Sequence, residues 1–197
     1  MVQAALTGGI ATGKSYCLAR LAALGVPTID ADKLARLAVA PGSPGLTAVV
    51  ARFGSGMLRD DGTLDRPALA RVIFADRVAR ADLEAIVHPE VYRRIRDWFA
   101  QLPLTTTVGV ADIPLLFETG HEHDFDAVIV AACSTEEQLR RLMTRDGLAE
   151  GDARARLAAQ FPIDEKVRRA HYVIRTDGDF AETDAEIQRI YEQLRSL

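Results

Sequence analysis

The sequence predicts an α/β fold in which helices flank a five-stranded parallel sheet. Five short runs carry apolar residues on both faces rather than in alternation, as expected of parallel strands that are covered on both faces. Segments with helical spacing separate these runs, so strands and helices alternate along the chain. A glycine-rich turn precedes the first helix, and one long helical stretch interrupts the alternation.

The glycine-rich turn has the pattern Gly8-x4-Gly13-Lys14-Ser15 and follows the apolar run at residues 2–6. Glycines let main-chain N–H groups approach an anion, and a helix N-terminus adds unpaired donors and a partial positive charge. The pattern predicts a phosphate-binding loop and hence a P-loop NTPase fold, in which Lys14 reaches the β- and γ-phosphates and Ser15 ligates Mg²⁺. The alternative is a turn that only caps a helix. Nucleotide contacts are expected from Gly8, Gly9, Ala11, Thr12, Gly13, Lys14, Ser15 and Tyr16.

The remaining strands and the first helix follow from local patterns. Leucines recur at helical spacing over residues 14–24, and Gly25 is a suitable stop. A short second strand is expected at residues 27–30. The other three strands are expected within residues 105–114, 126–133 and 171–176.

Residues 32–102 are predicted to be helical, with breaks at residues 41–45 and 60–62 and an N-cap at Asp65. This stretch is too long for a simple crossover between parallel strands, so we expect an inserted helical substrate domain. The domain limits would be about residues 1–31 and 104–197 for the core and about residues 32–103 for the insertion.

The last third of the chain adds three predicted helices. Ser134 and Glu137 predict a capping box for a helix that runs to about Arg145. A second helix is expected at residues 151–160. A final amphipathic helix at residues 180–197 would cover the sheet.

Two aspartates at the end of the second strand are candidate catalytic groups. Asp30 and Asp32 are two residues apart, so in an extended chain their side chains point the same way. Phosphoryl transfer needs a carboxylate that accepts a proton from the substrate hydroxyl and helps to hold Mg²⁺. Asp30 also suits the N-cap of the next helix, so we expect Asp32 to be the catalytic group.

Two acidic residues near the third strand are less specific. Asp112 ends that strand and either supports Mg²⁺ or caps the turn at Pro114. Glu118 faces either the cleft or the surface. The expected metal ligands are Ser15, Asp32 and Asp112.

Arginines are dense between Arg140 and Arg169. A kinase must exclude water, and arginines on a closing lid stabilise the transferring phosphoryl group. We expect a lid at about residues 146–170, with Arg145, just before Gly147, as the catalytic arginine. The alternative is a solvated helix with Glu/Arg pairs. The other arginines considered are Arg140, Arg141, Arg154 and Arg156.

His88, followed by Pro89, is expected between two helices of the insertion. It either binds a phosphate of the acceptor or caps the preceding helix.

The composition restricts the class of partner. The chain has 197 residues, of which 48% are hydrophobic, and a formal net charge of −4, which argues against binding nucleic acid or an anionic membrane. No basic leader or run of roughly 20 apolar residues is present, so we expect a soluble cytoplasmic protein, monomeric or weakly self-associating. Cys17 and Cys133 lack metal-ligand spacing and are expected to be buried free thiols.

Six segments resemble, in order and spacing, the motifs of dephospho-coenzyme A kinases: ALTGGIATGKSY, IDAD, HP, DIPLLFETG, TRD and AAQFPIDEKVRRAHYVI. The resemblance spans residues 6–178. It implies transfer of the γ-phosphoryl group of ATP to the ribose 3′-hydroxyl of dephospho-CoA, the last step of CoA biosynthesis. It further implies an ATP-binding core, a helical CoA domain and a lid, with Asp32 as catalytic carboxylate assisted by Lys14 and Arg145. The acceptor would contact Thr7, Asp32 and His88.

The chain departs from this family pattern at three places. Ala11-Thr12 stands where the family usually has Gly-Ser, which is tolerable if φ at Ala11 is negative. Ala170-His171 replaces Ala-Asp, and Thr176 stands at the position of an asparagine, which puts contacts to adenine in doubt.

Three other functions are alternatives to this assignment. A P-loop kinase for a nucleoside or a similar hydroxyl acceptor would share the same loop. A GTPase-type switch would need an Asn-Lys-x-Asp segment, and the chain contains no asparagine. A scaffold that binds nucleotide without catalysis would transfer phosphate to no acceptor.

Overall fold

The computed structural model describes all residues 1–197, and the chain divides into two compact units. The sheet unit comprises Met1–Ile29 and Leu102–Leu197, and the helical unit comprises Asp30–Gln101. Each unit has its own hydrophobic core.

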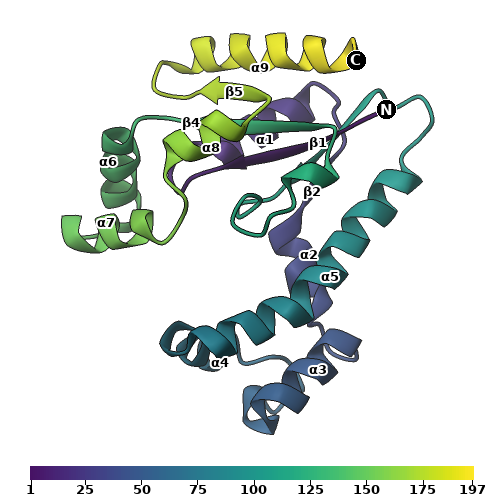
Figure 1. The fold of residues 1–197 in the computed structure, drawn as a ribbon, viewed down its shortest axis with the longest axis vertical. Coiled ribbons are helices and arrows are strands. Elements are labelled where there is room, and N and C mark those ends of the chain that lie inside the picture. The colour runs from purple at the N-terminus through teal and green to yellow at the C-terminus, as the bar shows by residue number, and fades with distance from the viewer. The chain divides into compact units, whose positions relative to one another are not determined.

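The strands are β1 (Val2–Gly8), β2 (Thr28–Asp30), β3 (Val108–Asp112), β4 (Ala127–Ala132) and β5 (Tyr172–Arg175). They form one sheet in the order β2-β3-β1-β4-β5, with the predicted parallel arrangement (Figure 1). Leu6 of β1 lies beside Asp112 on one side and Ile129 on the other. Every residue of β3 and β4 is buried, because helices cover both faces of the sheet, and this explains why these strands are apolar without alternation.

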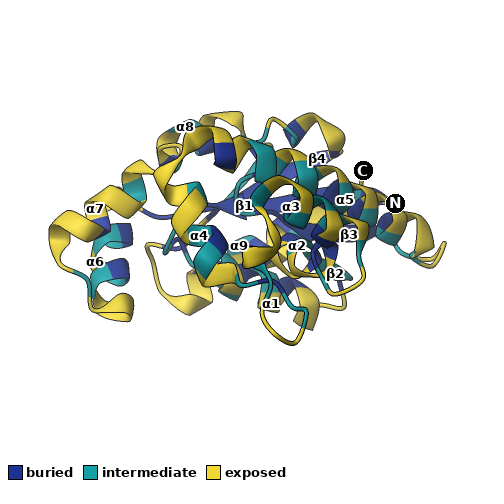
Figure 2. Ribbon diagram, turned by 90° about the horizontal axis from the view of Figure 1, so that it is seen from below, coloured by how far each residue is buried: buried dark blue, intermediate teal, exposed yellow.

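The helices of the sheet unit are α1 (Lys14–Ala23), α6 (Thr135–Asp146), α7 (Glu150–Ala158), α8 (Ile163–Arg169) and α9 (Phe180–Arg195), with a 3₁₀ turn η2 (Glu122–Asp124). Helices α1 and α9 pack against each other and bury Leu21, Ile187 and Ile190 in the core on one face of the sheet. Helix α7 buries only Ala153, so exposed residues predominate on it in Figure 2.

The helical unit consists of α2 (Ala31–Ala38), α3 (Pro44–Phe53), α4 (Arg66–Ala75) and α5 (Arg77–Gln101), with a 3₁₀ turn η1 (Ser55–Met57). Helix α5 packs against the other three helices. The side chains of Asp30, Ser43 and Asp65 accept main-chain N–H groups at the starts of α2, α3 and α4, so the predicted cap at Asp65 is confirmed. Their core contains Val39, Leu46, Val49, Leu64 and Leu69.

The expected break at His88-Pro89 is wrong, because both residues lie inside α5. The break comes earlier, at Asp76, whose carboxylate accepts the N–H of Val78 at the start of α5. Pro89 removes only one hydrogen bond, and the buried residues on either side of it keep the long helix packed.

The expected capping box at Ser134 is only half formed. The Ser134 hydroxyl accepts the N–H of Glu137, but the Glu137 carboxylate binds Arg140 and Arg141 instead of the Ser134 N–H. That N–H donates to Asp177 over 2.6 Å. A complete capping box occurs at the start of α9, which was not predicted.

Helix α8 was also not predicted, because its seven residues are too few for a clear helical period. Cys17 and Cys133 are buried and free, as expected. None of the helices has both the length and the hydropathy that a membrane-spanning segment requires.

Candidate active site

The predicted phosphate loop, residues 8–15, connects β1 to α1. Gly13 is the N-cap of α1 and has φ 81°, a conformation that glycine adopts without strain. A Cβ on Gly8 would lie 2.7 Å from the carbonyl oxygen of Ala131, and a Cβ on Gly9 would lie 2.5 Å from Nε2 of Gln138. The glycines are therefore required by close packing against β4 and α6.

Ala11 corrects one sequence-based expectation. Its φ is +61°, and it is the one residue other than glycine with a positive φ. The expectation of a negative φ is wrong, because the loop keeps a left-handed turn at a position where the family usually has glycine. Such a conformation costs an L-residue about 1–2 kcal/mol.

Side chains from distant segments hold the main chain of the loop. Gln138 of α6 donates to the carbonyl of Ile10 over 2.7 Å, and the Ile10 N–H donates to Gln160 over 2.9 Å. The Thr176 hydroxyl donates to the carbonyl of Thr12 over 2.7 Å. Sequence analysis missed the two glutamines as supports of the loop, because nothing in the sequence around either one indicates such a contact.

The Lys14 ammonium forms an ion pair with the carboxylate of Asp112. Both side chains are largely buried, with exposed fractions of 15% and 9%. The parallel register of β1 and β3 brings Asp112 to the end of the sheet where the loop begins, which is where ligands bind in open α/β sheets. The pair thus places one ammonium group and one carboxylate side by side at the loop.

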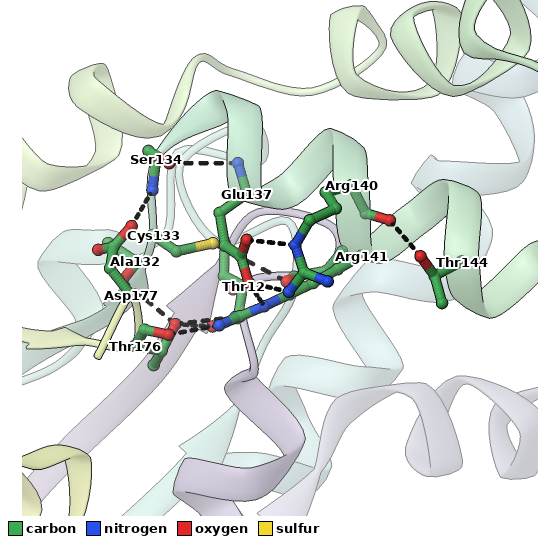
Figure 3. Close-up of polar contacts among 11 residues, drawn as sticks. Thr12, Ala132, Cys133, Ser134, Glu137, Arg140, Arg141, Thr144, Thr176 and Asp177 are labelled. Atoms are coloured by element: carbon green, nitrogen blue, oxygen red, sulfur yellow. Dashed lines mark hydrogen bonds and ion pairs between the residues drawn. The ribbon is translucent and has the colours of Figure 1, made fainter. Parts of the chain in front are cut away.

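Arg141 and Glu137 connect α6 to the end of β5 (Figure 3). Arg141 donates to both the hydroxyl and the carbonyl of Thr176. Hydrogen bonds from Arg140 and then Arg141 lower the pKa of Glu137 to about 2. Of the arginine-rich segment, Arg141 therefore supports the loop through Thr176, which itself binds Thr12.

Arg145, the predicted catalytic arginine, is exposed and hydrogen-bonds Asp146. This hydrogen bond raises the pKa of Arg145. Arg156 binds the same aspartate, and Arg154 pairs with Glu150. The structure thus pairs these three arginines with acidic residues of α6 and α7 rather than with the loop.

The candidate site residues of the helical unit lie at the start of α2 and within α5. Asp30 is the N-cap of α2, and its carboxylate accepts the N–H groups of Asp32 and Lys33. Asp32 is exposed in the first turn of α2, and its side chain takes no part in the cap. His88 is half-buried within α5.

Two other predicted contact residues have structural partners. Thr7 is buried, and its hydroxyl donates to the carbonyl of Pro114 over 3.1 Å. The Tyr16 hydroxyl donates to Asp184 of α9, a hydrogen bond that raises the pKa of Tyr16.

Glu118, expected to face either the cleft or the surface, is half-buried and pairs with the fully buried Lys166, a pair that sequence reasoning missed. Lys166 Nζ lies 2.7 Å from Glu118 Oε1, and its side chain has no exposed surface. Burial lowers the pKa of Lys166. The one signal in the sequence is the spacing Ile163-x-x-Lys166, which puts the lysine on the apolar face of a helix.

The parallel sheet and the glycine-rich loop define a P-loop nucleotide-binding protein, and solved structures place the fold among small-molecule kinases. Shikimate kinase from Acinetobacter baumannii, in complex with shikimate, shares this fold with a TM-score of 0.55 at 16% identity, and the match covers 100% of this chain and 94% of that one. Dephospho-CoA kinase from Campylobacter jejuni reaches a TM-score of 0.76 at 28% identity over 98% of this chain and 97% of that one. A Thermus thermophilus crystal structure reaches 0.83 at 34% identity, with the same coverage.

Sequence comparison is more specific. The family model described as dephospho-CoA kinase matches residues 2–182. The dephospho-CoA kinase of Anaeromyxobacter dehalogenans is 47% identical over 96% of this chain and 90% of its own length. That of Syntrophotalea carbinolica is 44% identical over 98% and 92%. The chain belongs to the dephospho-CoA kinase family, and the alternative of a kinase for a nucleoside acceptor is not favoured.

Proposed function

We propose that the protein transfers the γ-phosphoryl group of ATP to the ribose 3′-hydroxyl of dephospho-CoA and releases CoA and ADP. Membership of the dephospho-CoA kinase family carries this proposal. The glycine-rich loop, with Lys14 paired to Asp112 at its base, supports it, because such a loop binds the phosphates of a nucleotide.

The residues of the loop would bind the triphosphate. The loop would contact its oxygens through the residues predicted to bind nucleotide, and Lys14 would contact the β- and γ-phosphates. Those residues are Gly8, Gly9, Ala11, Thr12, Gly13, Lys14, Ser15 and Tyr16. Asp112 already pairs with this ammonium and so holds the lysine side chain at the base of the loop. The reaction would then depend mainly on positioning and charge stabilisation.

Asp32 would accept the proton of the 3′-hydroxyl. Its exposed position in the first turn of α2, outside the cap formed by Asp30, leaves the carboxylate free to meet a substrate. Arg145 would follow the charge of the transferring group once it exchanges Asp146 for phosphate. Thr7 and His88 would contribute to binding the acceptor.

Mg²⁺ would be held by oxygen donors from Ser15, Asp32 and Asp112. The donor chemistry fits, because Mg²⁺ prefers hard oxygen ligands and is commonly bound by one or two carboxylates plus substrate phosphates. When bound, the ion would neutralise charge on the phosphate oxygens.

The same proposal assigns roles to larger parts of the chain. Residues 32–103 would form the CoA-binding domain, and residues 146–170 would form a lid over the nucleotide. The enzyme would work in the cytoplasm as a monomer or weak homo-oligomer.

A coupled assay tests the reaction. The protein is mixed with ATP, Mg²⁺ and dephospho-CoA, and ADP formation is followed together with mass spectrometry of the product. We expect acceptor-dependent ADP release and a product heavier by one phosphoryl group. An analogue of dephospho-CoA that lacks the 3′-hydroxyl is the matched control, and equal ADP release with that analogue would contradict the proposal.

A further inference from the structure

A buried ammonium group lies directly behind the phosphate loop. Lys166 of α8 has 0% side-chain exposure. Its Nζ lies 2.7 Å from Glu118 Oε1 and 3.4 Å from each of the carbonyl oxygens of Gly8 and Pro114. A lysine ammonium has three donors, and here all three face an acceptor. Burying such a charge costs several kcal/mol unless it is paired, so this arrangement is a specific feature of the fold.

The three acceptors belong to segments that the reaction uses. Gly8 opens the phosphate loop, and Pro114 lies in the turn that follows Asp112. The Pro114 carbonyl also accepts the hydroxyl of Thr7. Lys166 thereby joins the start of the loop to the segment that carries the partner of Lys14.

Glu118 connects the same network to a second point in the loop. Its Oε1 also accepts the N–H of Phe161 over 3.0 Å. Phe161 follows Gln160, whose side chain accepts the N–H of Ile10 within the loop. Residues 160–166 thus contact the loop twice, through Gln160 at Ile10 and through Lys166 at Gly8.

We propose that Lys166, held by Glu118, is a positioning residue for phosphoryl transfer that fixes the main chain of Gly8 and of the turn after Asp112. It acts through these segments, because its buried side chain has no surface with which to touch a substrate. Burial, with a smaller contribution from the charge on Lys14, lowers the pKa of Lys166. This inference rests on the proposed function, since its readout is the transfer reaction.

Steady-state kinetics with ATP and dephospho-CoA test the inference. Lys166→Met should lower kcat about 10- to 100-fold, because small misplacements of a phosphate site are costly, with KM for dephospho-CoA changed less than about twofold. Glu118→Gln keeps an acceptor oxygen of the same size and should give a smaller loss of about fivefold. Lys166→Arg should recover part of the rate. Arg189→Met, at an exposed arginine of α9 outside the proposed lid, is the control and should behave as the wild type.

Protein folding is controlled separately. Lys166→Met leaves Glu118 buried without its partner, so the double variant Lys166→Met/Glu118→Gln, which removes both charges, is measured as well. Circular dichroism and thermal unfolding establish the folded fraction, and kcat is expressed per folded molecule. A reduced kcat in folded Glu118→Gln and in the double variant supports positioning. Wild-type kcat per folded molecule in either would overturn it, whereas an inactive wild type would instead contradict the proposed function.

Discussion

The positive φ of Ala11 shows that the shape of the loop imposes backbone strain on one residue. The neighbouring hydrogen bonds hold Ile10 and Thr12 from both sides, so Ala11 has no freedom to leave the left-handed region. The loop keeps its shape by using several partners elsewhere in the sheet unit. Strain at such a site is typical of positions where the surroundings over-determine the backbone.

Ala11→Gly should therefore stabilise the protein. Removing the Cβ relieves about 1–2 kcal/mol of strain, and the greater freedom of glycine in the unfolded chain offsets part of this. We expect a net gain of about 0.5–1 kcal/mol in the free energy of unfolding, measured by urea denaturation. Ala19→Gly, at an exposed position inside α1, is the control and should destabilise by a similar amount. A loss of stability in Ala11→Gly would contradict the prediction.

Asp32→Asn should lower kcat about 100-fold or more while leaving KM for ATP nearly unchanged, because the amide cannot accept the proton of the acceptor hydroxyl. Initial rates with varied ATP and dephospho-CoA measure both constants. Asp30→Asn is the matched control. Asparagine is as good an N-cap as aspartate, so this variant should keep both stability and turnover. Near-normal turnover of Asp32→Asn would remove that carboxylate from the proposed role.

At the scale of elements, the first turn of α6 is a junction. Its cap Ser134 donates to Asp177, its Glu137 binds two arginines, and its Gln138 supports the loop. Charge pairing in this turn thus stabilises the contact between α6 and the end of β5 as well as the helix itself.

Acidification should weaken this junction. The folded pKa of Glu137, about 2, is below its ordinary value of 4.5, so the ionised carboxylate stabilises the folded state. That contribution is complete above about pH 4.5 and is lost as the pH falls toward about 2. We expect the difference in unfolding free energy between the wild type and Glu137→Gln to be constant from about pH 7 to 5 and to shrink below that range. Urea denaturation at several pH values measures it, with the exposed Glu136→Gln as control. A difference that grew on acidification would contradict the assignment.

Strands β3 and β4 were predictable because their runs are apolar without alternation. The loop was predictable because its pattern is contiguous. Helix α8 is too short for a helical period to show in the sequence. Pro89 indicates a break, but α5 packs well enough on either side to contain it. The supports of the loop could not be predicted. Gln138, Gln160 and Lys166 reach residues 8–10 only through the fold, from positions more than a hundred residues away in sequence.

At the scale of the whole molecule, each of the two units has its own hydrophobic core. The core of the sheet unit includes residues of β1 and β4, whereas the core of the helical unit includes Val49 and Leu69. If the helical unit binds the CoA part of the acceptor and the sheet unit binds ATP, the two ligands should stabilise different parts of the chain.

Hydrogen exchange with mass spectrometry measures this division. We expect a non-hydrolysable ATP analogue with Mg²⁺ to slow exchange in residues 8–17, and dephospho-CoA alone to slow exchange within residues 30–101. Desulfo-dephospho-CoA, which lacks only the thiol, should give the same pattern as dephospho-CoA. Protection by dephospho-CoA confined to the sheet unit would contradict the proposed role of the helical unit.

The interruption of the sheet unit by residues 30–101 has a consequence for how the chain is made. On the ribosome β1 emerges first, but both of its neighbours, β3 and β4, come from beyond the interruption. The intervening helices contain a complete apolar cluster, so they can collapse before β1 meets its partner strands. Such an early collapse would shorten the effective distance that β1 must bridge to reach β3 and β4.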